Sequence, residues 1–326
     1  MSPSMVSRAL SGGIVDEEKR QQVFALAEKY QYMPNRFASR LSMRPVRIGV
    51  FICTKYISGS ELLRKGIQMA HSELSDYKIE LDMIVKNEPE LDFEEVCRAL
   101  DSFRGYDGVI VSGLNADKFT QTLNRLTESM PNLVMLQQAN EKVNYLFASK
   151  HDEKTASGIA CDFFCSCFKN SGSRNVLLFT GSLESDVHRN AKLAFLSTCA
   201  QRGIHVLDVV DMRDDEDVLR QQLPIVFGKY ADQINGCYIT SGVSISLCDY
   251  ICKYRPDVRL VTFDVYDKLN TYIHNGTVDA TLYQNLSRQG YVAFRGLVEH
   301  IIEHKPLDKV IYTNVQLVTK TGLSVL

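Results

Sequence analysis

The apolar run VRIGVFIC, residues 46–53, decides the fold because it is the first of a series of short runs rich in β-branched and aliphatic residues. Further runs of this kind follow at residues 79–85, 106–113, 132–138, 175–182, 204–210, 236–242, 258–264 and 278–285. Turns and amphipathic stretches separate them. Continuously apolar strands that alternate with helices are typical of a parallel sheet covered on both faces. The sequence therefore predicts a doubly wound α/β protein.

Helical patterns fill several of the intervals between these runs. They are predicted at residues 58–75, 94–103, 153–172, 188–203 and 287–304. Nine strands are more than one sheet of this kind usually holds, and a mixed stretch at residues 145–155 interrupts the alternation midway. We therefore expect two Rossmann-like lobes, with a small ligand held between them at the carboxyl ends of the strands. No strand end carries a dinucleotide fingerprint or a P-loop.

The charge of the chain is unevenly distributed. The net charge is −2, but residues 1–44 hold seven Lys and Arg against four Asp and Glu, so this segment carries +3 and the remainder −5. A basic N-terminal segment on an acidic body is typical of proteins that contact nucleic acid locally, although charge alone leaves chance as an equal explanation.

Other classes of protein receive little support from the composition. The nine scattered cysteines indicate reduced thiols in a cytoplasmic protein, and Cys161 and Cys165 lack a second pair at zinc-ligand spacing. The chain has no apolar run long enough to span a membrane and no signal-peptide core. No spacing of a nucleophile and a base suggests catalysis. We expect no enzyme, no metal, no cofactor and no membrane partner.

The N-terminal segment predicts short helices. In SPSMVSRALSG, residues 2–12, a helix that begins at Ser2 or Ser4 places Pro3 in its first turn, where the missing N–H costs nothing. A second helix is expected to begin after Asp16 as its N-cap. Its buried stripe is predicted to consist of Val23, Leu26, Ala27 and Tyr30, and a short basic helix is predicted behind Pro34. On pattern alone these remain generic helices.

A resemblance to a known family suggests a role for these helices. SPSMVSRALSGG, VDEEKRQQVFALAEKYQYMPNRFASRLSM and RIGVFI together resemble the lactose-repressor (LacI/GalR) family of bacterial transcription regulators. That family's headpiece typically reads V-S-x-x-T-V-S-R-x-L-N, then T-R-x-x-V, then Y-x-P-N-x-x-A-x-x-L. The match covers residues 2–44 in the right order and continues into the core.

The resemblance implies contacts with operator DNA. The first helix is similar to the recognition helix of a helix-turn-helix, which lies in the major groove, and Leu41 is similar to a wedge that enters the minor groove. Without the resemblance to this family, Leu41 would be interpreted as an ordinary core leucine. The residues implied to contact DNA are Pro3, Ser4, Ser7, Arg8, Asn35, Arg36 and Leu41.

The segment also departs from the family. Met5 stands where the family usually has Thr, and Ser11 where it often has Asn, so base preference does not transfer. The family's first helix, which braces the recognition helix, has no counterpart in the sequence, so we expect either a start codon assigned too late or a loss of this helix. A short helix without its brace exposes an apolar face and is marginal alone. We therefore expect this chain to bind operator DNA weakly or not at all.

The core resembles the ribose-binding-protein-like branch of the same family. Residues 259–297 are similar to the pattern V-x-F/G-D, L-x-x-G and I-x-Q-x-x-x-x-Q-G-Y. The resemblance implies that Asp264 and Gln284 bind sugar hydroxyls, that Arg189 or Ala191 holds the place of the ligand arginine, and that Asp152 is the interlobe aspartate. Carboxylates, amides and guanidinium groups suit the paired donors and acceptors of a polyol.

Structural alternatives stay open for each of these four residues. Asp264 suits a helix cap or an interlobe ion pair, Gln284 a hinge hydrogen bond, Arg189 a surface charge and Asp152 an N-cap. The family's aromatic stacking residue has only Tyr56 nearby, and Tyr56 is out of register.

We therefore predict a cytoplasmic homodimeric LacI/GalR-type regulator of the periplasmic-binding-protein-like type I fold, whose operator affinity depends on a sugar or polyol effector between two lobes. The alternative is a stand-alone cytoplasmic sugar- or solute-binding protein without DNA binding. The expected domains are a partial helix-turn-helix headpiece at 1–33, a hinge helix and linker at 34–45 and a core at 46–326, with lobe 1 at about 46–154 plus 285–306 and lobe 2 at about 155–284 plus 307–326.

Overall fold

The computed structural model describes residues 1–10, 14–30, 44–54, 57–86, 92–114 and 117–325. The chain divides into two compact units: Met1–Val46 with Leu74–Glu80, and Arg47–Glu73 with Leu81–Leu326. Residues 34–43 of the predicted hinge helix and linker (34–45) lie outside the described residues. The same holds for Asn35, Arg36, Leu41 and Tyr56.

The described N-terminal residues of the first unit form the α-helices α1 (Pro3–Leu10) and α2 (Glu17–Lys29). The Met5 amide donates to Ser2 Oγ at 3.3 Å, so Ser2 caps α1 and Pro3 takes the first helical position, as predicted. Asp16 is the N-cap of α2, as predicted, because its Oδ1 accepts hydrogen bonds from the amides of Glu18 and Lys19. The helices pack on each other around buried residues Ala9 and Val23.

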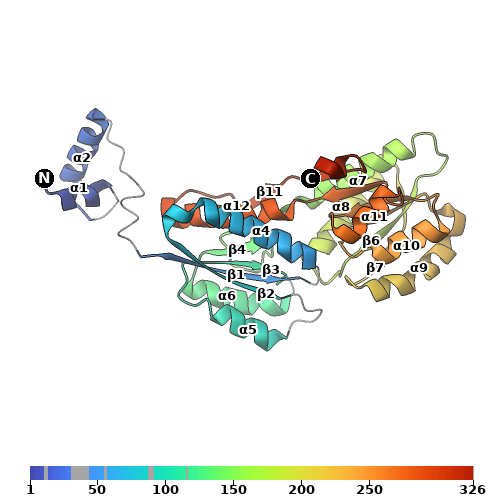
Figure 1. The fold of residues 1–326 in the computed structure, drawn as a ribbon, viewed down its shortest axis with the longest axis horizontal. Coiled ribbons are helices and arrows are strands. Elements are labelled where there is room, and N and C mark those ends of the chain that lie inside the picture. Colours follow the sequence, from blue (N-terminus) through green and yellow to red (C-terminus); the bar gives the residue numbers. More distant parts are fainter. Residues whose placement is uncertain (11–13, 31–43, 55–56, 87–91, 115–116, 326) are drawn as a thin grey trace. The chain divides into compact units, whose positions relative to one another are not determined.

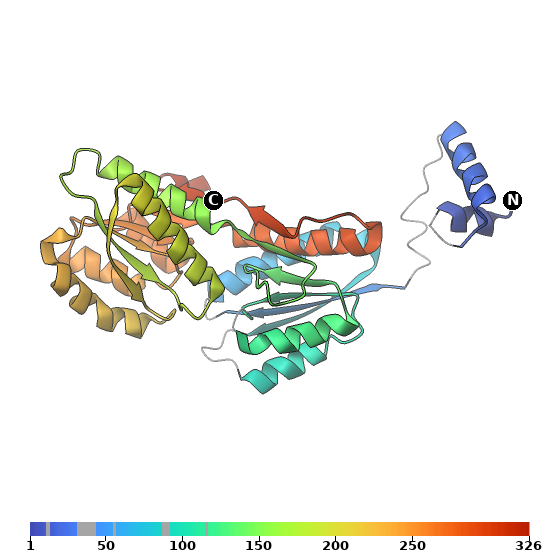
Figure 2. The ribbon, with the colours of Figure 1, turned by 180° about the vertical axis from the view of Figure 1, so that it is seen from behind.

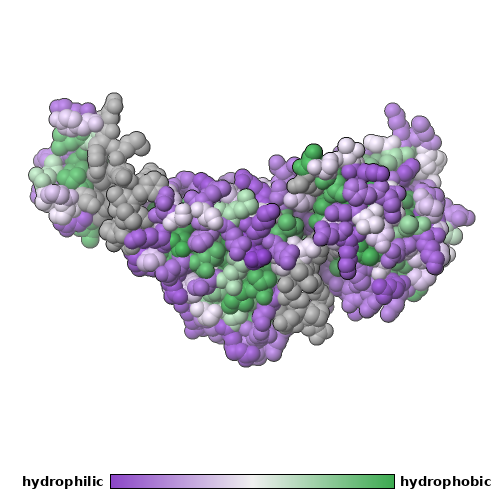
Figure 3. Space-filling model, viewed as in Figure 1, coloured by the Kyte–Doolittle hydropathy of each residue, from purple (hydrophilic) through white to green (hydrophobic). Residues whose placement is uncertain are grey.

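The predicted apolar stripe of α2 is only partly buried. Val23 is buried, but Leu26 is 46% exposed and Tyr30 72% exposed, so the prediction is wrong for these two residues. Phe24 on the same helix is 50% exposed. Apolar side chains therefore reach the surface of this unit (Figure 3). Two short helices offer too little surface to bury every apolar side chain of the pair.

The second unit contains two six-stranded sheets. The first has the order β11-β5-β4-β3-β1-β2, and its β1–β3, β3–β4, β4–β5 and β5–β11 pairs are parallel. Its strands are β1 (Val46–Cys53), β2 (Ile79–Lys86), β3 (Gly108–Ser112), β4 (Leu133–Leu136), β5 (Phe147–His151) and β11 (Val310–Thr313). The sheet lies between α4 (Ile57–Glu73) with α12 (Leu286–Glu303) on one face and α5 (Phe93–Asp101) with α6 (Thr120–Ser129) on the other (Figures 1 and 2).

The second sheet has the order β12-β10-β9-β8-β6-β7 and is parallel except for β12, which runs antiparallel to β10. Its strands are β6 (Asn175–Thr180), β7 (His205–Asp211), β8 (Gly236–Ile239), β9 (Arg259–Phe263), β10 (Ala280–Tyr283) and β12 (Gln316–Val318). Its helices are α7 (Glu153–Cys167), α8 (Asp186–Arg202), α9 (Glu216–Tyr230), α10 (Ile245–Tyr254) and α11 (Asp267–His274).

Strand β6 shows that both faces of the second sheet are covered. Leu177 and Phe179 belong to a core cluster with residues of α9, α10 and α11. Val176 and Leu178 belong to another cluster with residues of α7 and α8. Because successive strand residues point to opposite faces, the sheet is sandwiched between these two groups of helices. This arrangement confirms the prediction of two α/β lobes.

The chain crosses three times between the two sheets, from β5 to α7, from β10 to α12 and from β11 to β12. The third crossing corrects one expected boundary. Residues 307–326 were assigned wholly to lobe 2, but β11 pairs with β5 in the first sheet, and only β12 joins the second. Each of the nine predicted strands is present, whereas β5, β11 and β12 were not predicted. No helix in the described part of the chain is long and apolar enough to cross a membrane.

Candidate functional site

The structure brings Asp264 and Gln284 together at the carboxyl ends of two neighbouring strands. Asp264 directly follows β9 and Gln284 directly follows β10, and these strands are parallel and in register. Gln284 Nε2 donates a hydrogen bond to Asp264 Oδ2 at 2.9 Å. Both side chains are buried, with exposed fractions of 6% and 7%. The pair therefore forms one polar centre at the sheet edge where ligands bind in folds of this kind.

The backbone holds Asp264 in an unusual conformation. Its φ is 65°, in the left-handed region that non-glycine residues rarely adopt. Its amide donates to the carbonyl oxygen of Leu282 at 2.7 Å, and its own carbonyl oxygen accepts from Thr281 Oγ1 at 2.6 Å. These bonds stabilise a conformation that costs about 1–3 kcal/mol in isolation. Residues held in this way are often found at ligand sites.

One carboxylate oxygen of Asp264 is left for a ligand. Oδ1 is buried and has no hydrogen-bond partner among the described residues. Burial raises the pKa of Asp264 to about 7, although the hydrogen bonds from Gln284 act in the opposite direction. A buried acceptor without a partner is costly, so an incoming hydroxyl donor would relieve this penalty.

Gln289 extends the polar centre toward the first sheet. Its Nε2 donates to the Gln284 carbonyl oxygen and to Gln284 Oε1, each at 3.1 Å, and its Oε1 is buried without a partner among the described residues. The Gln289 carbonyl oxygen accepts from Ser149 Oγ at 3.1 Å. Because Ser149 lies on β5, a hydrogen-bonded chain connects residues of both sheets beside the β10–α12 crossing.

Three further polar residues lie at the β5–α7 crossing. The His151 ring lies 5.3 Å from the Phe263 ring, centroid to centroid, and burial lowers the pKa of His151. Lys150 Nζ donates to Glu153 Oε1 at 2.5 Å, and both side chains are buried. Lys150, His151, Glu153 and Gln289 were not predicted as site residues. Two signals were present: polar residues in the interrupted stretch at 145–155 are typical of a strand end that faces a site, and Gln289 is the second glutamine of the Q-x-x-x-x-Q-G-Y pattern.

Asp152 acts as the N-cap of α7, which is the structural alternative considered for it. Its carboxylate accepts hydrogen bonds from the Thr155 amide at 3.0 Å and from the Thr155 hydroxyl. Burial would raise the pKa of Asp152, but these bonds outweigh it and lower the pKa.

Arg189 lies near the start of α8 and makes its hydrogen bonds with nearby residues of the same segment. It donates to the carbonyl oxygens of Leu183 and Glu184 at 2.8 and 2.7 Å and pairs with Asp186. These bonds stabilise the turn that precedes α8. Ala191, the alternative position for the ligand arginine, is buried on α8.

A second polar cluster lies after β6, β7 and β8. Asp214 Oδ2 lies 3.3 Å from His188 Nε2, and Asp214 Oδ1 accepts from Ser241 Oγ at 2.7 Å. Burial would raise the pKa of Asp214, but His188 and Ser241 hold it well below its usual range. The backbone at Gly181 packs closely against the cluster. A Cβ there would lie 2.3 Å from both Asp214 Oδ1 and His188 Nε2, so a larger residue would collide with these atoms. His188 Nδ1 is buried without a partner among the described residues.

The residues implied to contact DNA are described in part. Pro3, Ser4 and Arg8 lie exposed on α1, and Arg8 Nε donates to the Ser4 carbonyl oxygen at 3.3 Å. Ser7 lies in α1, but its side chain is outside the described part of the chain.

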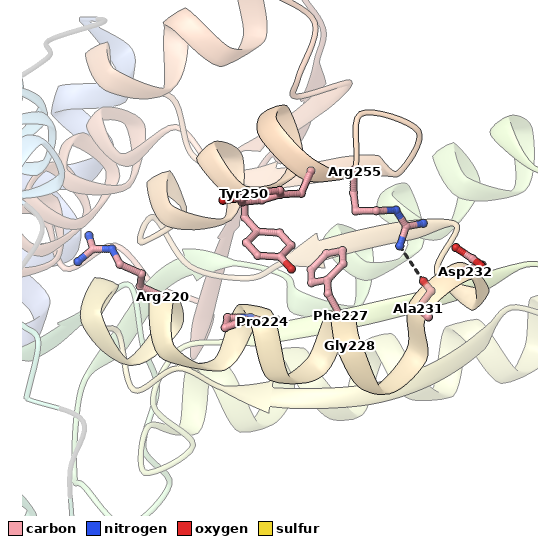
Figure 4. A pocket seen from close by; sticks show the side chains of 9 residues that line it. Arg220, Pro224, Phe227, Gly228, Ala231, Asp232, Tyr250 and Arg255 are labelled. Atoms are coloured by element: carbon pink, nitrogen blue, oxygen red, sulfur yellow. Dashed lines mark hydrogen bonds between the residues drawn. The ribbon is translucent and has the colours of Figure 1, made fainter.

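A groove of about 580 Å³ lies between α9 and α10 (Figure 4). Phe227 and Tyr250 line it with ring centroids 4.8 Å apart, and Arg255 donates to the Ala231 carbonyl oxygen at 2.7 Å. Arg255 also pairs with Asp257, so its charge is engaged locally. The groove lacks the convergent, unpaired polar atoms of the Asp264 centre. Within the described ranges, no cluster of three or more His, Cys, Asp or Glu is placed to hold a metal ion.

Comparison with solved structures shows the same fold. A glucose-galactose binding protein, GanP, from Geobacillus stearothermophilus is 21% identical with a TM-score of 0.75, over 86% of this chain and 99% of its own. The arabinose binding protein AraP from the same organism is 18% identical with a TM-score of 0.74, over 86% and 99%. A candidate LacI transcriptional regulator from Bacteroides fragilis is 17% identical with a TM-score of 0.73, over 87% and 100%.

A sequence comparison with curated proteins finds no match. The model of the periplasmic binding protein domain family, in contrast, matches residues 48–305, which is most of the chain. This family consists of ligand-binding proteins and not of enzymes. The structure agrees with that match. It has two lobes, each built on a mainly parallel sheet, with three chain crossings between them and a polar centre at the carboxyl ends of two strands. The chain therefore belongs to the periplasmic binding protein domain family.

Proposed function

We propose that this chain binds a sugar or a similar polyol at the Asp264–Gln284 centre. The observation that carries the proposal is the buried Asp264 Oδ1, which has no hydrogen-bond partner among the described residues and belongs to a residue with positive φ. A sugar hydroxyl donates one hydrogen bond and accepts others, so it satisfies a carboxylate and an amide at the same time. The similarity to glucose-galactose and arabinose binding proteins supports the same ligand class.

Isothermal titration calorimetry of the full chain against pentoses, hexoses and their phosphates tests this proposal. We expect at least one neutral sugar to bind, and we expect Asp264→Asn to weaken that binding by tenfold or more, because a hydrogen bond to a charged acceptor is lost. Asp217→Asn is the matched control, since Asp217 is an exposed carboxylate on α9. Absence of binding across the panel, or equal affinity in Asp264→Asn, would overturn the proposal.

A specific observation also favours a second candidate function, transcription regulation through DNA binding. Helix α1 exposes Pro3, Ser4 and Arg8, and residues 1–44 carry a net charge of +3 while resembling a LacI/GalR headpiece. The similarity to a candidate LacI regulator points in the same direction. On this hypothesis the chain is a cytoplasmic homodimer, because operator half-sites require two headpieces. Ligand binding would shift the equilibrium between two lobe arrangements and so alter DNA affinity.

A mobility-shift titration against DNA from upstream of the chain's own coding region tests this candidate separately. We expect weak binding that falls with salt and falls further in Arg8→Ala. Arg220→Ala is the control, because the Arg220 side chain on α9 is 67% exposed, and it should leave the titration unchanged. If sugar binds but no concentration of the chain shifts DNA, the stand-alone binding protein is the correct interpretation. Sedimentation of the same samples measures whether the chain forms the expected dimer.

A further inference from the structure

Two cysteine side chains meet between the first two helices of the second lobe. Cys161 on α7 and Cys199 on α8 place their Sγ atoms 3.4 Å apart. Both are fully buried in the apolar cluster that includes Phe164, Phe195 and Tyr238. A disulfide bond requires the sulfur atoms to approach by about 1.4 Å more, a distance within reach of side-chain rotation.

Arg202 brings a positive charge to this pair. Its Nη1 donates to the Gly158 carbonyl oxygen at 3.3 Å and pairs with Asp162, and these two residues flank Cys161 along α7. The hydrogen bond from Cys199 lowers the pKa of Cys161, the Arg202 charge adds to this effect, and the same pairing raises the pKa of Cys199. Because the thiolate is the nucleophile in thiol oxidation, Cys161 is the sulfur that reacts first.

The pair lies close to the protein surface. Cys165, one turn further along α7, is partly exposed, and Cys167 is exposed. Asp162, adjacent to Cys161, has a side chain that is 70% exposed. A local separation of α7 and α8 therefore suffices to admit a small oxidant, without unfolding of the lobe.

We propose that Cys161 and Cys199 are a site of reversible oxidation, at which hydrogen peroxide converts the two thiols into a disulfide that joins α7 to α8. The Cys161 thiolate attacks the O–O bond, forms a sulfenic acid and releases hydroxide, which takes up the thiol proton to give water. The Cys199 sulfur then displaces the sulfenic oxygen as a second water and forms the S–S bond. Two thiols and one peroxide thus give one disulfide and two waters, and a dithiol reductant reverses the reaction.

Peptide mapping of the full chain tests this site. The reduced protein is treated with hydrogen peroxide, blocked with iodoacetamide and digested with trypsin. We expect peptide 155–169 to be linked to peptide 193–202, with a mass about 2 Da below the sum of the two peptides in which Cys165 and Cys167 carry the iodoacetamide label and Cys161 and Cys199 are free thiols. Cleavage by chymotrypsin after Phe163 or Phe164 then separates Cys161 from Cys165 and identifies the linked sulfur. The bond closes a segment of 38 residues, so the melting temperature should rise and return to its original value with dithiothreitol.

Variants distinguish this pair from the other thiols. Cys199→Ser should lose the cross-link, whereas Cys167→Ser, on the same helix as Cys161, should keep it. If Cys199→Ser does not fold in the reduced state, Cys161→Ser serves the same purpose. A link through Cys165 or Cys167, a cross-link that survives in Cys199→Ser, or oxidation confined to the exposed Cys167 and Cys252 would overturn the proposal.

Discussion

At the residue scale, the candidate site depends on a carboxylate that is expensive to keep charged. Asp264 is buried, keeps one oxygen without a partner among the described residues and has a pKa raised to about 7 by burial. In the unfolded chain an aspartate titrates near its usual value of about 3.9. The folded protein therefore binds more protons than the unfolded chain between these two pKa values, and its stability falls as pH rises through that window. This cost supports the proposal that Asp264 belongs to a ligand site.

The pH dependence of stability tests this reasoning. Asp264→Asn removes the titration, so the stability of this variant relative to the wild type should increase by about 2–3 kcal/mol between pH 5 and pH 8. Urea denaturation at the two pH values measures the difference. Asp217→Asn should follow the wild type at both. If Asp264→Asn changes with pH in parallel with the wild type, Asp264 does not carry the raised pKa.

The buried ion pair at the β5–α7 crossing offers a second test at this scale. Glu153→Gln leaves the Lys150 ammonium buried without its counter-charge and should lower the free energy of unfolding by about 3–5 kcal/mol. Asp117→Asn breaks the Lys142–Asp117 pair, whose side chains are 65% and 67% exposed, and should cost about 0–1 kcal/mol. Equal effects of the two substitutions in urea denaturation would contradict the burial of the first pair.

At the element scale, two helices of the first lobe approach so closely that only glycine fits between them. A Cβ on Gly66 of α4 would lie 1.8 Å from the Ser287 carbonyl oxygen of α12, and a Cβ on Gly290 of α12 would lie 2.4 Å from the Leu63 carbonyl oxygen of α4. The contacted atoms belong to the backbone, which cannot rotate away as a side chain can. This close approach sets the position of α12, which begins directly after Gln284 and Asn285.

Alanine substitution of helical glycines measures this approach. Gly66→Ala should destabilise the protein by about 1–3 kcal/mol or more, because the helices must separate. Gly158→Ala on α7 is the matched control. Among the described residues, no atom beyond its own helical backbone lies within 4 Å of its Cβ position, so the substitution should stabilise by about 0.5–1 kcal/mol. Thermal denaturation of both variants gives opposite signs if α4 and α12 pack as described. A stabilising Gly66→Ala would contradict that packing.

The elements also show what the sequence predicts and what it does not. Apolar runs located each of the nine predicted strands, because buried parallel strands consist almost wholly of apolar residues. Strand β5 was not predicted because Ser149, Lys150 and His151 are polar although they are buried. Strand β11 belongs to the first sheet only through its pairing with β5, which is distant along the chain. Asp264 and Gln284 were implied by the resemblance. Gln289 belongs to the same Q-x-x-x-x-Q-G-Y pattern, but its hydrogen bonds to Gln284, like the ion pair of Glu153 with Lys150, are seen only in the fold.

At the scale of the whole molecule, ligand binding is linked to the stability of the folded chain. A ligand that binds only the folded state adds about 2.7 kcal/mol of stability at a concentration 100 times its dissociation constant. We therefore expect the sugar identified by calorimetry to raise the melting temperature of the wild type in a concentration-dependent way. Asp264→Asn should show a smaller rise at the same concentration, and an equal rise would place the ligand elsewhere.

The proposal that a polyol occupies the centre formed by Asp264 and Gln284 can be checked in a crystal structure of the full chain grown with the tightest-binding sugar of the panel. We expect a ligand hydroxyl within hydrogen-bond distance of Asp264 Oδ1, with Gln284 as a neighbour. A ligand bound in the α9–α10 groove, or at any site that leaves Asp264 Oδ1 without a partner, would contradict it.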